Sequence, residues 1–355
     1  MPGALFSDMG AFIAAFALAF GIALVLTPTV RRLAIHYGFT DAPSPRRSPI
    51  LKPRLGGLAI YAAFALCLAV VYQLIPGRVP AEEMRVAGLL GGGLIVLVMG
   101  VIDDRWELPA MVQLMAQVAA ALVALVSGIG IEKFTNPLSV EPGLLILPSG
   151  VAAAVTVLWL VGAMNTVNFL DGVDGLAVGV VAVAALVFAL HSLILGQMTI
   201  AVVAIAFAGA CFGFLPNNFY PARITLGTCG SAFLGYGLGV LAIIGGTKAA
   251  TLLLVLGVPL IDTGWVILRR IATGQSPFHG DRGHLHHRLL ALGLSEPQIV
   301  LGMYAISFFL GILALVLSTR LAKLYAIGIM GVAALALVVT LAYLNRRKVQ
   351  REASQ

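Results

Sequence analysis

The sequence predicts an all-α, polytopic membrane protein with about eleven transmembrane helices, its N-terminus outside and its C-terminus in the cytoplasm. Of the 355 residues, 60% are hydrophobic and only 10% are charged, whereas about a quarter of the residues of a typical soluble domain are charged. A soluble protein of this size could not remove so much apolar surface from water. The apolar residues also form continuous runs, which are typical of spanning helices and not of a membrane β-barrel.

Eleven apolar runs are long enough to cross the bilayer. The first is expected to be a spanning helix and not a cleaved signal peptide, because no Lys or Arg precedes it and no small-residue cleavage site follows it before Arg31. Pro and Gly residues in 131–150 predict a small external hairpin. The runs lie near residues 8–30, 55–75, 86–102, 109–130, 149–168, 175–194, 199–216, 229–245, 248–268, 298–317 and 323–344.

Basic residues set the orientation of these runs. Five segments on one face carry 16 of the 22 Lys and Arg residues: 31–54, 103–108, 217–228, 269–297 and 345–355. Loops rich in Lys and Arg stay in the cytoplasm, so this face is predicted to be cytoplasmic, together with the loop at 169–174. Topology thus accounts for the net charge of +7, and no nucleic-acid partner is expected. The whole chain, 1–355, is expected to form one integral membrane domain.

Several common site motifs are missing from the sequence. The three cysteines, Cys67, Cys211 and Cys229, lie in apolar segments without a CxxC pair, so neither disulfides nor a zinc site is expected. No GxxxxGK[ST] loop is present. The glycines at 91–93 and at 235–239 are expected to mark close helix packing.

Carboxylates gather at the ends of two runs. Asp103 and Asp104 end the third run, and Asp171 and Asp174 end the fifth. The predicted topology puts all four at the cytoplasmic surface, and we expect Asp104 and Asp171 to be accessible to water. Acidic residues at membrane depth are costly and usually functional, which favours a shared site over the alternative that they only cap helix ends.

A second regular pattern lies at the end of the fifth run and just after it. Asn165, Asn168, Asp171 and Asp174 recur every three residues, so they would line one side of a helix if the helix continued through them. Amide and carboxylate oxygens in a row suit a hard cation and a polar substrate.

The segment SPFHGDRGHLHHR at 276–288 holds four of the six histidines. Adjacent His286 and His287 would diverge on a helix or strand, which disfavours structural zinc, whereas histidines with forked Arg donors suit a diphosphate. Asp262, in the ninth run, is expected either to contact the substrate or to orient Arg269 and Arg270, and the sequence leaves both open.

These motifs together resemble one family, the polyprenyl-phosphate N-acetylhexosamine-1-phosphate transferases (glycosyltransferase family 4). The form of the last motif is closer to the branch acting on UDP-GlcNAc-type substrates than to the branch acting on UDP-MurNAc-pentapeptide. The matching segments are PRLGG at 53–57, GVIDD at 100–104, NTVNFLDGVDGLAVG at 165–179, LPNNFYPARI at 215–224, GSAFLG at 230–235 and DRGHLHHRLLALGLS at 281–295.

The resemblance implies a reaction and its participants. A polyprenyl phosphate, such as undecaprenyl phosphate, would attack the β-phosphate of a UDP-N-acetylhexosamine, releasing UMP in the first membrane step of cell-surface polysaccharide synthesis. It implies Mg²⁺ as cofactor, with Mn²⁺ as the alternative cation. It also implies a bacterial cytoplasmic membrane, contact with membrane lipid and an active site facing the cytoplasm, and it leaves a homodimer open.

The resemblance also implies residue roles. Asp103 and Asp104 would be catalytic and position or deprotonate the acceptor phosphate. Asn168, Asp171 and Asp174 would hold the metal. Substrate binding would involve Arg54, Asn165, Asp171, Asp174, Arg282, His284, His286, His287 and Arg288.

Three positions depart from the family pattern. Thr228, in GTCGS, stands where the family has an Asp that resembles a direct magnesium ligand, Gln113 replaces a Lys, and Pro49 replaces a His. A threonine hydroxyl is a poorer magnesium ligand than a carboxylate. The sequence therefore keeps two alternatives: a weak or inactive family member that binds lipid phosphate or nucleotide sugar, and a secondary transporter. Four acids at one surface, with a midplane nearly free of charge, disfavour transport.

Overall fold

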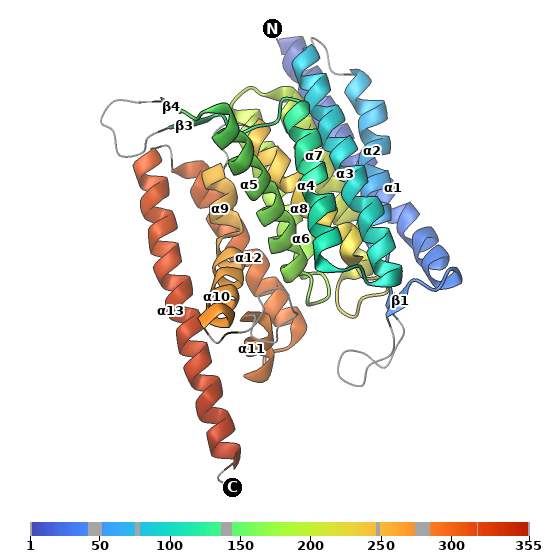
Figure 1. Cartoon of the computed structure of the whole chain (residues 1–355). Helices are drawn as coiled ribbons and strands as arrows, with labels where there is room; N and C mark the ends of the chain where they lie inside the picture. The colour runs from blue at the N-terminus through green and yellow to red at the C-terminus, as the bar shows by residue number, and fades with distance from the viewer. Residues whose placement is uncertain are drawn as a thin grey trace. The chain divides into compact units, whose positions relative to one another are not determined.

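A computed structural model describes residues 2–41, 52–74, 79–135, 144–245, 249–272, 274, 285–317 and 319–353. These residues are mostly helical and include two small two-stranded sheets (Figure 1). They divide into two compact units, Met1–Ala249 and Ala250–Gln355. Each unit is described by itself.

The first unit begins with α1 and ends as α9 starts. Its elements in chain order are α1 (Pro2–His36), β1 (Thr40–Asp41), β2 (Lys52–Pro53), α2 (Gly56–Val71), α3 (Pro80–Trp106), α4 (Ala110–Val126), β3 (Lys133–Thr135), β4 (Leu144–Ile146), α5 (Ser149–Leu170), α6 (Leu176–Ile194), α7 (Met198–Asn218) and α8 (Gly227–Ile244). A short 3₁₀ turn, Tyr72–Leu74, follows α2. The second unit holds α9 (Ala249–Val255), α10 (Gly257–Ala272), α11 (Leu285–Ala291), α12 (Glu296–Val316) and α13 (Arg320–Ala353).

The all-α, polytopic prediction is confirmed. Among the described residues, seven helices are long and apolar enough to cross a membrane, namely α1, α3, α5, α6, α7, α8 and α12, and three shorter apolar helices accompany them. The body of each of the eleven predicted runs is helical, except that the ninth is divided between α9 and α10. The number of spans and their orientation stay predictions.

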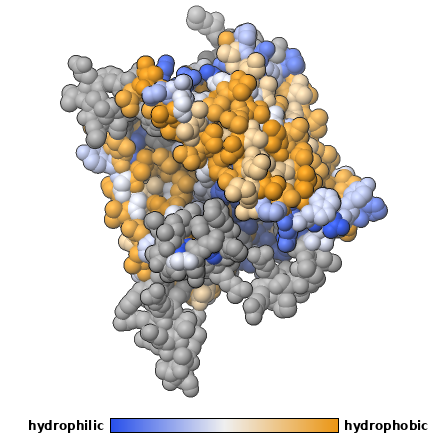
Figure 2. Space-filling model, in the orientation of Figure 1, coloured by the Kyte–Doolittle hydropathy of each residue, from blue (hydrophilic) through white to orange (hydrophobic). Residues whose placement is uncertain are grey.

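The outer surface agrees with a lipid environment. Large apolar side chains face outward along the helices, for example Val25 and Leu158, each 72% exposed. Figure 2 shows apolar residues gathered over the outer faces of the helices. In water such a surface would be costly, whereas in a bilayer it meets hydrocarbon.

Helix α8 organises the first unit, because it packs against α2, α3, α5, α6 and α7. Two glycines permit the closest approaches. A Cβ on Gly57 of α2 would overlap the backbone of Gly230, and a Cβ on Gly100 of α3 would overlap the backbone of Cys229. Small residues of this kind let helix backbones approach closely in membrane proteins. The start of α8 is thereby held between α2 and α3.

Further packing confirms other sequence predictions. Gly92 and Gly235 lie against Tyr236 and Met164, respectively, where a Cβ would not fit, so the glycine clusters do mark close helix contacts. Phe64, Phe207 and Phe233 form an aromatic core between α2, α7 and α8. The cysteines are buried and unpaired, as expected. The predicted hairpin is also present, since β3 pairs antiparallel with β4.

Candidate active site

Asp103 stabilises the connection between α3 and α4. It lies in the last turn of α3 and is 8% exposed. Its Oδ1 accepts hydrogen bonds from the Leu108 N–H (2.8 Å) and from Gln113 Nε2 (2.9 Å). Gln113 Nε2 also donates to Leu108 O (3.1 Å), so the short turn folds around the carboxylate. Within the described part of the chain, Asp103 Oδ2 accepts no hydrogen bond.

Asp104 caps a different helix. Its Oδ1 accepts the N–H of Thr228 (2.8 Å) and its Oδ2 accepts the N–H of Cys229 (3.2 Å), both in the first turn of α8. The first N–H groups of a helix have no partner within it, and a negative charge at that end is favourable. Gly227 has φ +73°, and a Cβ there would collide with this carboxylate.

The expectation that water reaches Asp104 is therefore wrong. The side chain is 7% exposed because α3 continues through Trp106 and directs this carboxylate onto α8. Asp171, in contrast, is half-buried. Arg54 lies near enough to Asp104 for its positive charge to act on the carboxylate.

The end of α5 carries the amides. Asn165 Nδ2 donates to Gln117 Oε1 of α4 (2.9 Å) and to Val161 O (2.8 Å). Asn168 Oδ1 accepts a hydrogen bond from Ser231 Oγ of α8 (2.8 Å). Ser231 is fully buried and its Oγ lies 3.3 Å from Thr228 O.

The predicted stripe of four polar residues is only half present. Helix α5 ends at Leu170, so Asn165 and Asn168 share its surface, whereas Asp171 is the C-cap residue and Asp174 lies in the turn before α6. Gly175, with φ +81°, begins α6 in a conformation that favours glycine. The chain therefore reverses direction between the two aspartates.

The first two turns of α8 connect the two polar clusters. Thr228 and Cys229 bind Asp104 of α3, and Ser231 binds Asn168 of α5. The predicted convergence of these two helix ends is therefore found. Sequence reasoning missed Ser231, although it lies in the GSAFLG segment that was singled out.

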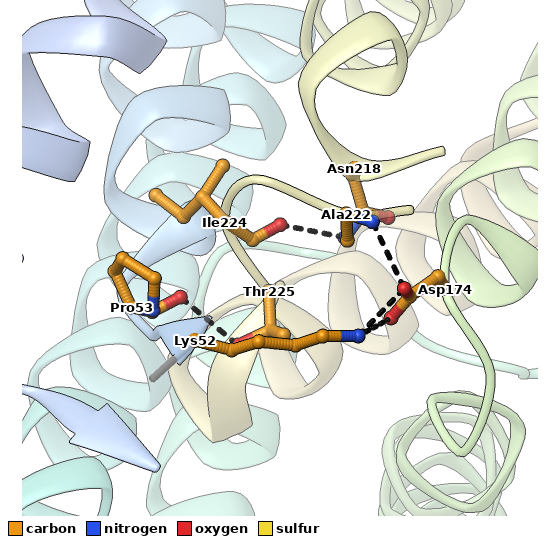
Figure 3. A network of polar contacts seen from close by, with 7 residues as sticks. All are labelled: Lys52, Pro53, Asp174, Asn218, Ala222, Ile224 and Thr225. Carbon is orange, nitrogen blue, oxygen red and sulfur yellow. Dashed lines mark hydrogen bonds and ion pairs between the residues drawn. The ribbon is translucent and has the colours of Figure 1, made fainter. Parts of the chain in front are cut away.

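Asp174 faces another part of the chain. Its carboxylate accepts hydrogen bonds from Lys52 Nζ, at 2.7 Å to Oδ2 and 2.9 Å to Oδ1, and from the Ala222 N–H, at 2.9 Å to Oδ2 (Figure 3). Sequence reasoning gave Lys52 no role, although it stands two residues before Arg54 in KPRLGG. The proximity of Lys52 to Arg54 could have drawn attention to it, but nothing in the sequence identified Asp174 as its partner.

The oxygen donors at the end of α5 fit a hard cation. Among the described residues, no three His, Cys, Asp or Glu side chains gather into a metal site. Mg²⁺, however, usually takes one or two protein carboxylates and completes its shell with substrate phosphates and water. Asn168 Oδ1 and the Asp171 carboxylate are donors of this kind. Asp174 fits less well, because an ammonium group already lies against it.

Two departures from the family pattern contact the aspartate pair directly. The Thr228 N–H binds Asp104, and the Gln113 amide binds Asp103. Both contacts use neutral donors. Pro49 lies outside the described residues.

In the second unit, Asp262 of α10 holds the start of α11. The Leu285 N–H donates to Asp262 Oδ1 (2.8 Å), and Asp262 and Arg288 are both buried. Asp262 therefore helps to orient α11. Arg282 and His284 lie outside the described residues, as do the side chains of His286 and His287. Their predicted meeting with the aspartates stays a prediction.

Comparisons with known proteins find similarity over most of the chain. The profile of Glycosyl transferase family 4 matches residues 86–246. The chain is 35% identical over 314 residues to a probable undecaprenyl-phosphate N-acetylglucosaminyl 1-phosphate transferase of Bacillus subtilis, covering 86% of this chain and 85% of that protein. It is 35% identical to a decaprenyl-phosphate N-acetylglucosaminephosphotransferase of Mycolicibacterium smegmatis, covering 90% of this chain and 86% of that protein. It is 33% identical to a phospho-N-acetylmuramoyl-pentapeptide-transferase of Desulforudis audaxviator, covering 84% of this chain and 95% of that protein.

Proposed function

This chain belongs to glycosyl transferase family 4, and we propose on that basis that it transfers an N-acetylhexosamine-1-phosphate from a UDP-sugar to a polyprenyl phosphate, releasing UMP. It is a multi-pass membrane enzyme. Similarity to the two N-acetylglucosamine phosphotransferases favours N-acetylglucosamine as the hexosamine. The lipid-linked product would start a cell-surface polysaccharide.

One observation carries the proposal beyond similarity. The start of α8 joins Asp104 at the end of α3 to Asn168 at the end of α5. Phosphoryl transfer depends on positioning and charge neutralisation more than on covalent chemistry by the protein. The first turns of α8 bind both the Asp104 carboxylate and the Asn168 amide, and they supply such positioning.

The two aspartates would have different tasks. Asp104 has both oxygens engaged by backbone N–H groups, so it would position α8. Asp103 Oδ2 accepts no hydrogen bond from the described residues, so it would accept a proton from the acceptor phosphate or orient it. The phosphate oxygen would form a bond to the β-phosphorus of the UDP-sugar as the bond from that phosphorus to the UMP oxygen breaks.

The cofactor proposal is Mg²⁺, with Asn168 and Asp171 as its protein ligands. When bound, the cation would neutralise negative charge on the diphosphate. Ser231 would hold the Asn168 amide in one orientation through its hydroxyl. Arg54 would add positive charge on the same side of the first unit.

The location proposal is the bacterial cytoplasmic membrane with the site facing the cytoplasm. It is supported by the excess of Lys and Arg, 16 of 22, on the face that is predicted to carry the site residues. UDP-sugars are made in the cytoplasm, which suits that orientation.

A second candidate is a binding protein without transfer activity. Thr228 favours it, because the position lies beside the aspartate pair and offers no carboxylate. A UMP-release assay separates the candidates: purified full-length protein is given polyprenyl phosphate, Mg²⁺ and a panel of UDP-sugars. We expect UMP release with UDP-N-acetylglucosamine. Binding of polyprenyl phosphate without UMP release from any UDP-sugar would favour the second candidate.

A further inference from the structure

We propose that Asp174 is a positioning residue, and that its ion pair with Lys52 clamps three separate segments around the transfer site. In this account Asp174 is not a cation ligand. The role assigned to the site rests on the proposed function, whereas the clamp itself is a structural claim that can be tested without activity.

The clamp joins segments that are far apart in the sequence. Lys52 lies in β2, Asp174 in the turn between α5 and α6, and Ala222 in the connection between α7 and α8. Lys52 Nζ contacts both carboxylate oxygens and the Ala222 N–H contacts Oδ2 (Figure 3). One carboxylate thus holds all three segments.

The contacts continue from Lys52 toward Asp104. Pro53 O, next in the chain, accepts hydrogen bonds from Thr225 N–H (2.8 Å) and Thr225 Oγ1 (3.1 Å). The Gly56 N–H donates to Thr225 O (3.1 Å), and the Gly57 N–H donates to Leu226 O (3.0 Å). Residues 53–57 therefore run alongside 225–226, directly before the turn of α8 that binds Asp104.

The connection between α7 and α8 is itself well fixed. The Arg223 N–H donates to Asn217 O (2.8 Å), and Asn218 Nδ2 donates to Ile224 O (3.0 Å). Asn218 is 2% exposed. Because these hydrogen bonds fix the conformation of the segment, we expect a displacement of Ala222 to displace residues 225–228 as well.

Charge and burial argue against a cation at Asp174. The Lys52 and Asp174 side chains are 22% and 10% exposed, so the pair is partly shielded from water. An ammonium group at 2.7 Å already neutralises the carboxylate, and a divalent ion on the same oxygens would be repelled by it. The same pair fixes the turn that carries Asp171, three residues earlier. Asp174 would thereby place Asp171 relative to the start of α8.

Four full-length variants test the clamp: Lys52→Met, Lys52→Arg, Asp174→Asn and the exchanged pair Lys52→Asp with Asp174→Lys. Arg32→Met, which removes an exposed basic residue near the end of α1, is the matched control. The first readout is hydrogen–deuterium exchange in residues 171–175 and 219–228. The second is UMP release as a function of UDP-sugar and magnesium concentrations.

The clamp predicts that Lys52→Met and Asp174→Asn both raise exchange in these two segments, and that Lys52→Arg and Arg32→Met do not. For Lys52→Met and Asp174→Asn it also predicts that kcat falls by roughly tenfold to 100-fold, as expected for misplaced groups. The magnesium concentration that gives half the maximal rate should change little. The exchanged pair should recover part of the protection.

The opposite pattern would overturn the clamp. That pattern is a strong shift of the magnesium dependence in Asp174→Asn together with wild-type exchange and turnover in Lys52→Met. If the wild-type protein releases no UMP but the exchange pattern follows the clamp, the proposed function fails and the clamp stands. If even Lys52→Met fails to fold, unchanged exchange and turnover in Lys52→Arg still test whether a cation at that position is what matters, and altered values would contradict the clamp.

Discussion

Asp104 and Thr228 are joined by a 2.8 Å hydrogen bond from the Thr228 N–H to the Asp104 carboxylate, so a residue at the end of α3 caps the start of α8. The second oxygen binds the neighbouring Cys229 N–H. The aspartate pair therefore consists of two differently placed carboxylates. This difference leads to separate predictions for the two residues.

Replacing Asp104 with Asn should destabilise the fold. An amide can accept only one of the two backbone N–H groups through its oxygen, and its NH₂ group would face the other donor. Losing a buried, charge-assisted contact costs about 1–3 kcal/mol. The free energy of unfolding, or the midpoint of thermal unfolding in detergent, measures this loss. An Asp104→Asn variant as stable as the wild type would contradict the capping role.

Replacing Asp103 with Asn should leave stability nearly unchanged and remove transfer. The Asn Oδ1 can still accept from Leu108 and Gln113, whereas the oxygen available for the acceptor phosphate is replaced by an NH₂ group. Loss of a proton-transfer group typically lowers the rate by about 10²–10⁴-fold. Turnover close to that of the wild type would remove Asp103 from the mechanism.

Thr228→Asp should change the response to magnesium. The new carboxylate would be attached beside the N–H group that binds Asp104, so like charges would repel each other without a cation and share it when a cation is bound. The gain in cation binding should be on the order of 1–3 kcal/mol. Thermal unfolding with and without Mg²⁺ and UMP release against magnesium concentration are the two measurements.

Gln113→Lys should be combined with Thr228→Asp in a double variant, because it adds a positive charge next to Asp103. If the wild-type protein already has full activity with ordinary magnesium dependence and Thr228→Asp is neutral or harmful, Thr228 does not mark a missing ligand. Metal binding would then rest on Asn168 and Asp171.

Ser231→Ala should raise the magnesium concentration needed for half-maximal rate. The change removes the hydroxyl that holds Asn168 Oδ1 and costs about 1 kcal/mol of contact energy. Ser192→Ala is the control, since Ser192 is equally buried but its Oγ bonds to Phe188 O within α6. Equal magnesium dependence in both variants would show that Ser231 does not orient a cation ligand.

The sequence predicted the elements of this fold better than the details of the site. Continuous apolar runs predicted the helices, because each must satisfy its own backbone hydrogen bonds in lipid. The convergence of the α3 and α5 ends was also predicted, since the alternating direction of the runs puts both ends on one face. The hairpin at β3 and β4 followed from Pro and Gly residues.

What the sequence could not give is which side chain meets which partner. The helical stripe failed at Leu170, because the regular spacing continues past the point where the chain reverses. Asp174 meets a lysine 122 positions earlier in the chain. Asp104 is buried because of the direction in which the last turn of α3 faces α8, which depends on the Gly100 and Gly57 approaches and not on any local pattern.

The most direct measurement is the balance of products formed by the purified full-length protein with UDP-N-acetylglucosamine, polyprenyl phosphate and Mg²⁺. We predict that the wild-type protein forms UMP and lipid-linked N-acetylglucosamine phosphate in equal amounts, and that Asp103→Asn, although folded, forms neither. UMP release without the lipid product, or equal product formation by Asp103→Asn, would contradict the proposed transfer at this site.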